Sequence, residues 1–116
     1  MAVEWTDSVG EVTRVLNEHP INSARCDQCA REIRTIGFSV DPMAFCMRVR
    51  PRGRERFVVP QASLERNWYF HYTACVQLHC VDVLTGVPGT LQQHYLERHW
   101  KYADALRLDI EEPSDV

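Results

Sequence analysis

The chain has 116 residues and a mass of 13.5 kDa, which suits one domain with a single buried core over residues 1–116. Hydrophobic residues make up 45% of the sequence and charged residues 25%, the proportions of an ordinary globular protein. The net charge of −3, together with the lack of an apolar run long enough for a membrane helix, predicts that neither nucleic acid nor membrane is a partner.

The N-terminal sequence and the cysteines indicate where the chain is made. MAVEWTDSVGEV lacks the basic and then apolar layout of a secretory signal. Five cysteines, at positions 26, 29, 46, 75 and 80, cannot all pair within one chain, and their spacing matches no small secreted disulfide framework. We therefore expect synthesis in the cytoplasm without a signal peptide, and reduced thiols.

Two helices are predicted in the first third of the chain. The first covers residues 9–16, where apolar side chains recur at helical spacing. The second is expected to start with Asn22 or Ser23 as its cap and to end at Gly37, a typical stop. This start places Cys26 in the first turn of the helix.

Strands are predicted next, and a helix at the end. Alternating and β-branched residues indicate strands at 43–50 and 54–60 across a Pro-Arg-Gly turn, and a hairpin over 67–84. Helical spacing returns over 89–108, and residues 108–116 are expected to fray. Helices followed by an antiparallel sheet and a C-terminal helix define an α+β domain.

The C-x2-C pair formed by Cys26 and Cys29 is the commonest sequence signal for zinc. A structural zinc site also needs a second compact pair on a turn, and the adjacent His79 and Cys80 do not supply one, because neighbouring strand residues point to opposite faces. We therefore expect no metal and no cofactor.

Cys26 differs from the other four cysteines, which are expected to be small buried hydrophobes. In the first turn of a helix, its sulfur lies among backbone N–H groups that favour a thiolate. Cys29 shares a face with Ile33 and Ile36, where burial raises a thiol pKa. We predict Cys26 as the nucleophile and keep Cys29 as its competitor.

A nucleophilic cysteine needs a base and a group that orients the base. His71 and Asp82 are the candidates, since a tight turn near Gln77 and Leu78 would place them on neighbouring antiparallel strands. The alternative interpretation is a satisfied core histidine and a surface aspartate near a turn.

The order of these motifs resembles the papain-like cysteine peptidases, and more closely the small papain-fold toxin domains of bacterial polymorphic toxin and effector systems. The motifs are CDQCA, FHYTACV and VDVLTGVP, all within residues 22–88. The resemblance implies a papain-like fold in which Cys26 attacks an amide carbonyl, His71 transfers protons and Asp82 fixes the histidine. A glutamine that often precedes the cysteine in that family is absent, so Asn22 or the backbone N–H of Cys26 would complete the oxyanion hole.

The resemblance also implies a role and partners. It predicts a monomeric peptidase or amidohydrolase that is carried by a secretion system into a target cell, acts there on a protein, and is neutralised by a cognate immunity protein. The same residues would suit a glutamine deamidase or a transamidase. A different class also fits the size and the acidic pI of 5.9: a non-catalytic immunity or adaptor module whose contact surface is the run of arginines at positions 48, 50, 52, 54 and 56.

Overall fold

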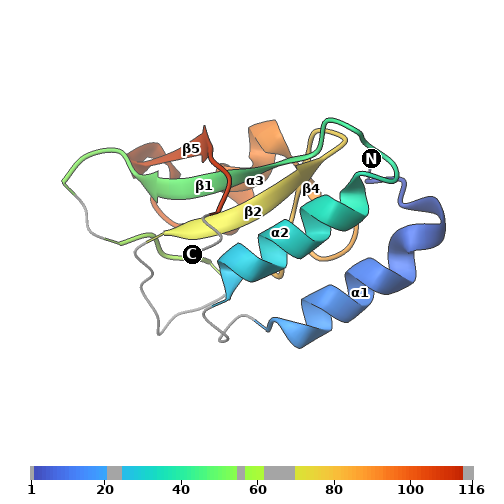
Figure 1. Ribbon diagram of the computed structural model, residues 1–116. Helices are drawn as coiled ribbons and strands as arrows, with labels where there is room; N and C mark the ends of the chain where they lie inside the picture. The colour runs from blue at the N-terminus through green and yellow to red at the C-terminus, as the bar shows by residue number, and fades with distance from the viewer. Residues whose placement is uncertain (1, 21–24, 55–56, 62–69, 114–116) are drawn as a thin grey trace.

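An antiparallel sheet of five strands is the centre of the fold over the residues that the structure describes, which are 2–20, 25–54, 57–61 and 70–113 of a computed structural model. Its strand order is β4-β3-β2-β1-β5 (Figure 1). The strands are β1 (Phe45–Pro51), β2 (His71–Val76), β3 (His79–Val81), β4 (Thr90–Leu91) and β5 (Leu106–Ile110).

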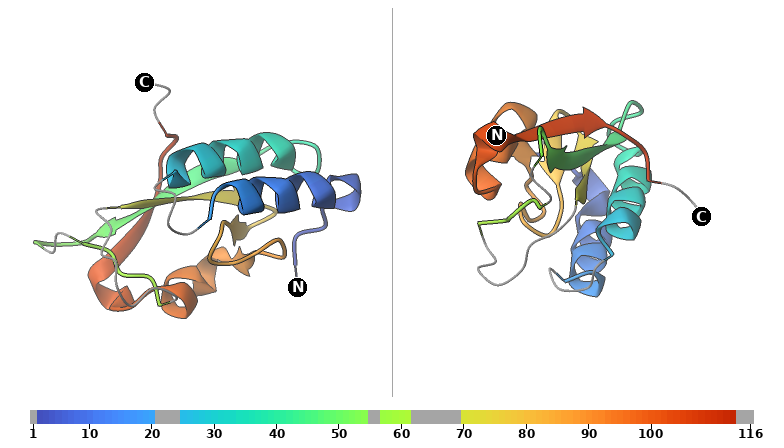
Figure 2. Two further views of the ribbon diagram at one scale, coloured as in Figure 1. Left: turned by 90° about the horizontal axis from the view of Figure 1, so that it is seen from below. Right: turned by 90° about the vertical axis from the view of Figure 1, so that its left-hand side faces the viewer.

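Helices cover the sheet on both sides. Helices α1 (Val9–Glu18) and α2 (Cys26–Gly37) lie side by side along one face, and α3 (Gln92–His99) lies behind the other (Figures 1 and 2). Short 3-10 turns, η1 (Thr6–Ser8) and η2 (Ala103–Ala105), precede α1 and β5.

Each face of the sheet has its own apolar core, because successive strand residues point to opposite sides. Under α1 and α2, the buried side chains include Val12, Ile33 and Val76. On the other face, Tyr95 and Trp100 pack with members of β1, β3 and β5. The two helical layers are therefore held by separate cores on a shared sheet.

The predicted turn between β2 and β3 is confirmed. Gln77 and Leu78 both have positive φ, 50° and 65°, which is the conformation of a two-residue turn that matches the twist of a hairpin. The turn fixes the register, with Ala74 opposite Val81.

The predicted α+β class is confirmed, but two element predictions are wrong. Within 54–60, the described residues contain no named strand, and Pro60 forms only an isolated bridge with Trp100. The last helix ends at His99, and the chain turns at Tyr102, where φ is 57°. β5 then takes the edge of β1 where the 54–60 strand was expected.

The frayed tail was also predicted too long. Residues 108–110 belong to β5, and Glu111 and Glu112 pair with arginines. The apolar spacing over 89–108 predicted a helix, but Leu106 and Leu108 are alternate residues of a strand and pack on its apolar side.

Helix α2 starts later than expected. Its first residue is Cys26 and its N-cap is Arg25, which makes no capping hydrogen bond with its side chain. Asn22 and Ser23, the predicted caps, lie outside the described residues. Cys26 nonetheless occupies the first turn, as predicted.

The domain is compact, with a radius of gyration of 13.2 Å, close to the roughly 13 Å expected for a single domain of this length. Among the described residues, no helix combines the length and the apolar composition that crossing a bilayer requires.

The close approach of α2 to β2 gives a first prediction. A Cβ atom on Gly37 would lie 2.6 Å from Cγ2 of the fully buried Val76, so Gly37→Ala should lower the free energy of unfolding by about 1–3 kcal/mol. Gly10→Ala is the matched control: nothing lies within 4 Å of its Cβ, and alanine favours the helix by up to about 1 kcal/mol. Urea unfolding of both variants measures the difference, and equal stabilities would contradict the tight packing.

Candidate active site

The first turn of α2 presents the Cys26 sulfur. The first helical hydrogen bond of this turn runs from the Cys29 N–H to the Arg25 carbonyl, 3.0 Å, so the N–H groups of residues 26–28 precede the bonded part of the helix. The sulfur is partly buried against Ala30, Cys46 and Tyr72. A thiolate here lies at the positive end of the helix.

His71 is the first residue of β2 and is only 2% exposed. Its Nε2 lies 3.3 Å from Oδ2 of Asp82, and its ring stacks at a tilt against Trp100 with the centroids 5.3 Å apart. The indole therefore covers the imidazole on the side of the second core, the apolar cluster that contains Tyr95 and Trp100.

Asp82 is held by the turn that follows β3. Its Oδ1 accepts the backbone N–H groups of Leu84 and Thr85, at 2.8 and 3.1 Å, while its Oδ2 accepts the hydroxyl of Tyr95 at 2.6 Å. The carboxylate is 3% exposed, so it is fixed by several donors in a dry environment.

The short length of β3 allows these groups to meet. β3 ends at Val81, opposite Ala74, so residues 71–73 of β2 extend past it. At this uncovered edge, Cys26 lies close enough to His71 and to the backbone of Tyr72 for both to lower its thiol pKa. A cysteine on one face of the sheet thus reaches a histidine whose ring lies toward the other.

The three groups shift one another's pKa so that each favours its charged form. Burial opposes ionisation of Cys26, but the hydrogen bond and positive charge of His71 outweigh it and lower the thiol pKa. Burial likewise opposes protonation of His71, yet Asp82 and Cys26 raise its pKa to about 9. Burial would raise the pKa of Asp82, but His71, Thr73 and Tyr95 lower it to about 2. Near neutral pH the favoured forms are therefore an imidazolium at His71 and a carboxylate at Asp82, and Cys26 ionises more readily than an ordinary thiol.

The geometry also assigns the two ring nitrogens. An ionised carboxylate can only accept hydrogen bonds, so the Nε2 that faces Asp82 carries a proton. Nδ1 is then the nitrogen that exchanges a proton with Cys26 or with a substrate. Asp82 orients this tautomer without being consumed.

The structure thus brings together Cys26, His71 and Asp82, the three residues predicted from the sequence. Cys29 is 4% exposed, and burial raises its pKa to about 12, so it does not compete as the nucleophile. Asn22, the residue predicted for the oxyanion hole, lies outside the described residues.

Two residues around the site were missed. Tyr95 bonds Asp82, and Trp100 covers His71, but both were interpreted only as apolar positions of a helix. Helical spacing cannot reveal that the Tyr95 hydroxyl reaches the turn that follows β3. Beside His71 on β2, the Tyr72 hydroxyl bonds Glu111 at 2.7 Å.

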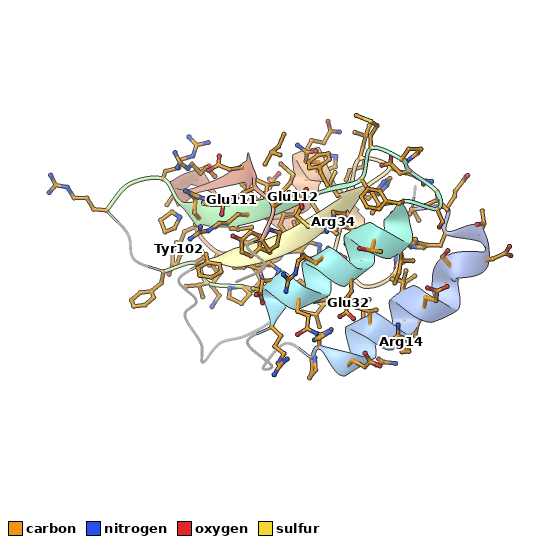
Figure 3. The ribbon with its side chains drawn as sticks, in the orientation of Figure 1. Arg14, Glu32, Arg34, Tyr102, Glu111 and Glu112 are labelled. Carbon is orange, nitrogen blue, oxygen red and sulfur yellow. The ribbon has the colours of Figure 1, made fainter. Side chains whose placement is uncertain are left out.

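Two members of the run of arginines, Arg48 and Arg50, are paired with carboxylates. Arg48 and Arg50 both bond Glu111, and Arg50 also lies 3.3 Å from Asp109. Figure 3 shows Glu111 and Glu112 beside the strands, with Arg34 of α2 close to Glu112, its ion-pair partner. The arginines therefore attach the end of the chain to the sheet and to α2.

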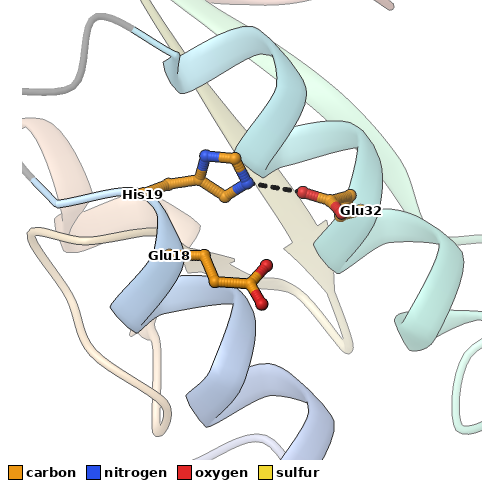
Figure 4. Close-up of side chains that lie close together, drawn as sticks. All are labelled: Glu18, His19 and Glu32. Atoms are coloured by element: carbon orange, nitrogen blue, oxygen red, sulfur yellow. Dashed lines mark hydrogen bonds and ion pairs between the residues drawn. The ribbon is translucent and has the colours of Figure 1, made fainter.

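One group of described side chains has the composition of a metal site: Glu18, His19 and Glu32, whose ligand atoms lie within 4.8 Å of one another. His19 Nε2 bonds Glu32 at 2.6 Å, which ties the end of α1 to α2 (Figure 4). Glu18 pairs with Arg14. None of the three belongs to the Cys26 site, and an ion pair between helices accounts for the contact.

Comparison with known proteins finds no match to a family model, to a curated protein or to a solved structure.

The ionisation of Cys26 gives a second prediction. Cys29 and Cys46 have a pKa of about 12 and Cys75 of about 11, and that of Cys80 is also raised, all chiefly by burial. Ultraviolet thiolate absorbance below pH 9 should therefore come from one sulfur. It should vanish in Cys26→Ala and move to higher pH in His71→Phe, which removes the imidazolium. An unchanged titration in His71→Phe would contradict the ion pair.

The pair of His71 and Asp82 gives a third prediction. Because the pKa of Asp82 is lowered from its ordinary 3.8, the carboxylate stabilises the folded protein at pH values above 3.8. This stabilisation is lost as the pH falls toward about 2. Because the pKa of His71 is raised from its ordinary 6.5, the imidazolium stabilises the folded protein at pH values below 6.5. This stabilisation is lost as the pH rises through about 9.

Asp82→Asn should therefore lower the free energy of unfolding most between about pH 4 and 6.5, by about 2 kcal/mol, and by less at lower or higher pH. Urea unfolding of both proteins across this range measures the cost. A cost that is independent of pH would mean that the residue serves only as a hydrogen-bond acceptor in the turn.

Proposed function

We propose that the protein is a cysteine peptidase or amidohydrolase that acts on a protein substrate through Cys26, His71 and Asp82. The observation that carries this proposal is a half-buried cysteine whose thiol pKa is lowered by a buried imidazole, which itself lies 3.3 Å from a buried carboxylate. A histidine that only fills a core needs no buried carboxylate: His79, for example, hydrogen-bonds the backbone carbonyl of Gln77 through Nδ1, at 2.7 Å.

The mechanism follows from the charges of the three groups. The Cys26 thiolate attacks the amide carbonyl, and the backbone N–H groups at the start of α2 stabilise the negative oxygen. The His71 imidazolium gives its Nδ1 proton to the leaving amine, and a thioester remains. Neutral His71 then takes a proton from water, which attacks the thioester and releases a carboxylate and the thiolate.

Asp82 acts through His71. It keeps the Nε2 proton in place, and its charge stabilises the imidazolium. Tyr95 and the turn at residues 84 and 85 hold the carboxylate, so these are positioning groups. The same steps on a glutamine side chain give deamidation, and an amine in place of water gives transamidation.

The resemblance to papain-fold toxin domains extends the proposal to the target. We infer a bacterial toxin that is delivered into another cell, cleaves or deamidates a protein there and is held inactive in its producer by an immunity protein. The rival is the non-catalytic module with an arginine contact surface. The pairing of Arg48 and Arg50 with Glu111 leaves less free charge for that surface.

Expression in a bacterial cytoplasm gives the fourth prediction. Cys26→Ala should retain the fold and abolish growth inhibition, since no thiolate remains, with a loss of turnover of about 10³-fold or more. Cys29→Ala is the matched control, which should cost about 1 kcal/mol of stability and keep most of the activity. Growth curves and thermal unfolding of the purified variants report the two effects.

Proteome-wide peptide mapping of the arrested cells identifies the reaction. New peptide termini indicate cleavage, and conversion of glutamine to glutamate indicates deamidation. Full toxicity of a folded Cys26→Ala protein would exclude the proposed chemistry and favour the non-catalytic module.

A further inference from the structure

Cys26 and Cys29 lie on one turn of α2, at its start. Helix geometry places the Cα atoms of residues three apart at about 5 Å, inside the range that a disulfide spans. The first turn can adjust to close the bond, because its N–H groups precede the bonded part of the helix. Hydrolysis uses only Cys26, so the second sulfur is left without a role in the mechanism.

We propose that Cys26 and Cys29 form a reversible oxidation site, in which a peroxide oxidises Cys26 and Cys29 closes an intrachain disulfide. Cys26 is half-buried, while Cys29, three residues further along α2, is buried. An oxidant from solvent therefore meets Cys26 first, and the sulfur nearest along the helix is Cys29.

The chemistry balances with peroxide as the oxidant. The Cys26 thiolate attacks one peroxide oxygen and becomes a sulfenic acid, while the departing hydroxide takes the proton held by His71 and leaves as water. The Cys29 sulfur then attacks the Cys26 sulfur, and the hydroxyl group leaves with the Cys29 proton as a second water. Two thiols are oxidised and one peroxide is reduced, and a dithiol reductant reverses the process.

The oxidation requires only a thiolate with a neighbouring thiol, so it does not depend on amide hydrolysis. Its effect on activity does rest on the proposed function: a Cys26 sulfur bonded to Cys29 cannot attack a carbonyl. The disulfide would also protect Cys26 from irreversible oxidation to the sulfinic acid.

A second pair of cysteines provides an internal comparison. Cys75 and Cys80 lie directly opposite each other on β2 and β3, but both are at most 1% exposed. Their proximity alone would allow a disulfide, whereas access to solvent favours the pair on α2. The experiment must therefore separate the two pairs.

Trypsin separates them, because it cuts after Arg25 and Arg31. Cys26 and Cys29 then share the peptide 26–31, Cys46 lies in 35–48, and the strand pair lies in 67–98. The purified full chain is treated with hydrogen peroxide, denatured in the presence of iodoacetamide so that free thiols are alkylated, and digested without reduction. We expect peptide 26–31 to be unalkylated and two hydrogens lighter, and the other two peptides to be alkylated at every cysteine.

Two variants test the order of events. In Cys29→Ser, peroxide should leave a sulfenic acid at Cys26 that dimedone labels, and in Cys26→Ser, Cys29 should stay reduced and alkylated. Full alkylation of peptide 26–31 in the wild type, a disulfide in 67–98 instead, or accumulation of sulfinic acid at Cys26 would overturn the proposal.

The activity arm separates this proposal from the proposed function. Oxidised wild type should lose at least tenfold in activity and recover it with dithiothreitol, while oxidised Cys29→Ser should recover less. A disulfide that forms in a protein without hydrolytic activity would leave the oxidation site intact and exclude only the hydrolase. An active hydrolase that forms no disulfide would exclude only the oxidation site.

Discussion

The buried carboxylate of Asp82 is the constraint on which the rest of the site depends. A charge in a dry interior is costly unless several donors compensate it, and here two backbone N–H groups, a tyrosine hydroxyl and an imidazole do so. These donors come from three parts of the fold: both backbone N–H groups from the turn after β3, the hydroxyl from helix α3 and the imidazole from strand β2. Satisfying one charge thus fixes the position of three elements.

That arrangement explains why the sheet is irregular beside the cysteine. If β3 continued past Val81, it would cover residues 71–73 of β2, the part of the strand that contributes His71 to the site. Instead the chain turns at Asp82, whose Oδ1 caps the turn that ends the strand. One side chain therefore both terminates β3 and orients the histidine of the opened edge.

The sequence predicted the parts of the fold and the site that depend on local patterns. Valine spacing gave α1, and the paired strands followed from β-branched runs around Gln77 and Leu78, whose register placed His71 near Asp82. The β5 strand was missed, because Leu106 and Leu108 fit helical and strand spacing equally well, and pairing with β1 decides between them. Tyr95 was missed for a related reason: its hydroxyl meets Asp82 only after α3 folds against the sheet.

The two halves of the site differ in how they are held. His71, Asp82, Tyr95 and Trp100 come from one continuous stretch of 30 residues and pack in the second core, whereas Cys26 is carried by the layer of α1 and α2, which has its own core. A fluctuation that moves α1 and α2 away from the sheet would separate the Cys26 sulfur from His71. The contact between His71 and Asp82 would remain in place. Slow amide hydrogen exchange in α3 and β3, with faster exchange in α1 and α2, would be the signature of such a partial opening. Nucleophile and base would then meet only while the helical layer is docked, so the free energy of this docking limits the fraction of molecules that are competent to react.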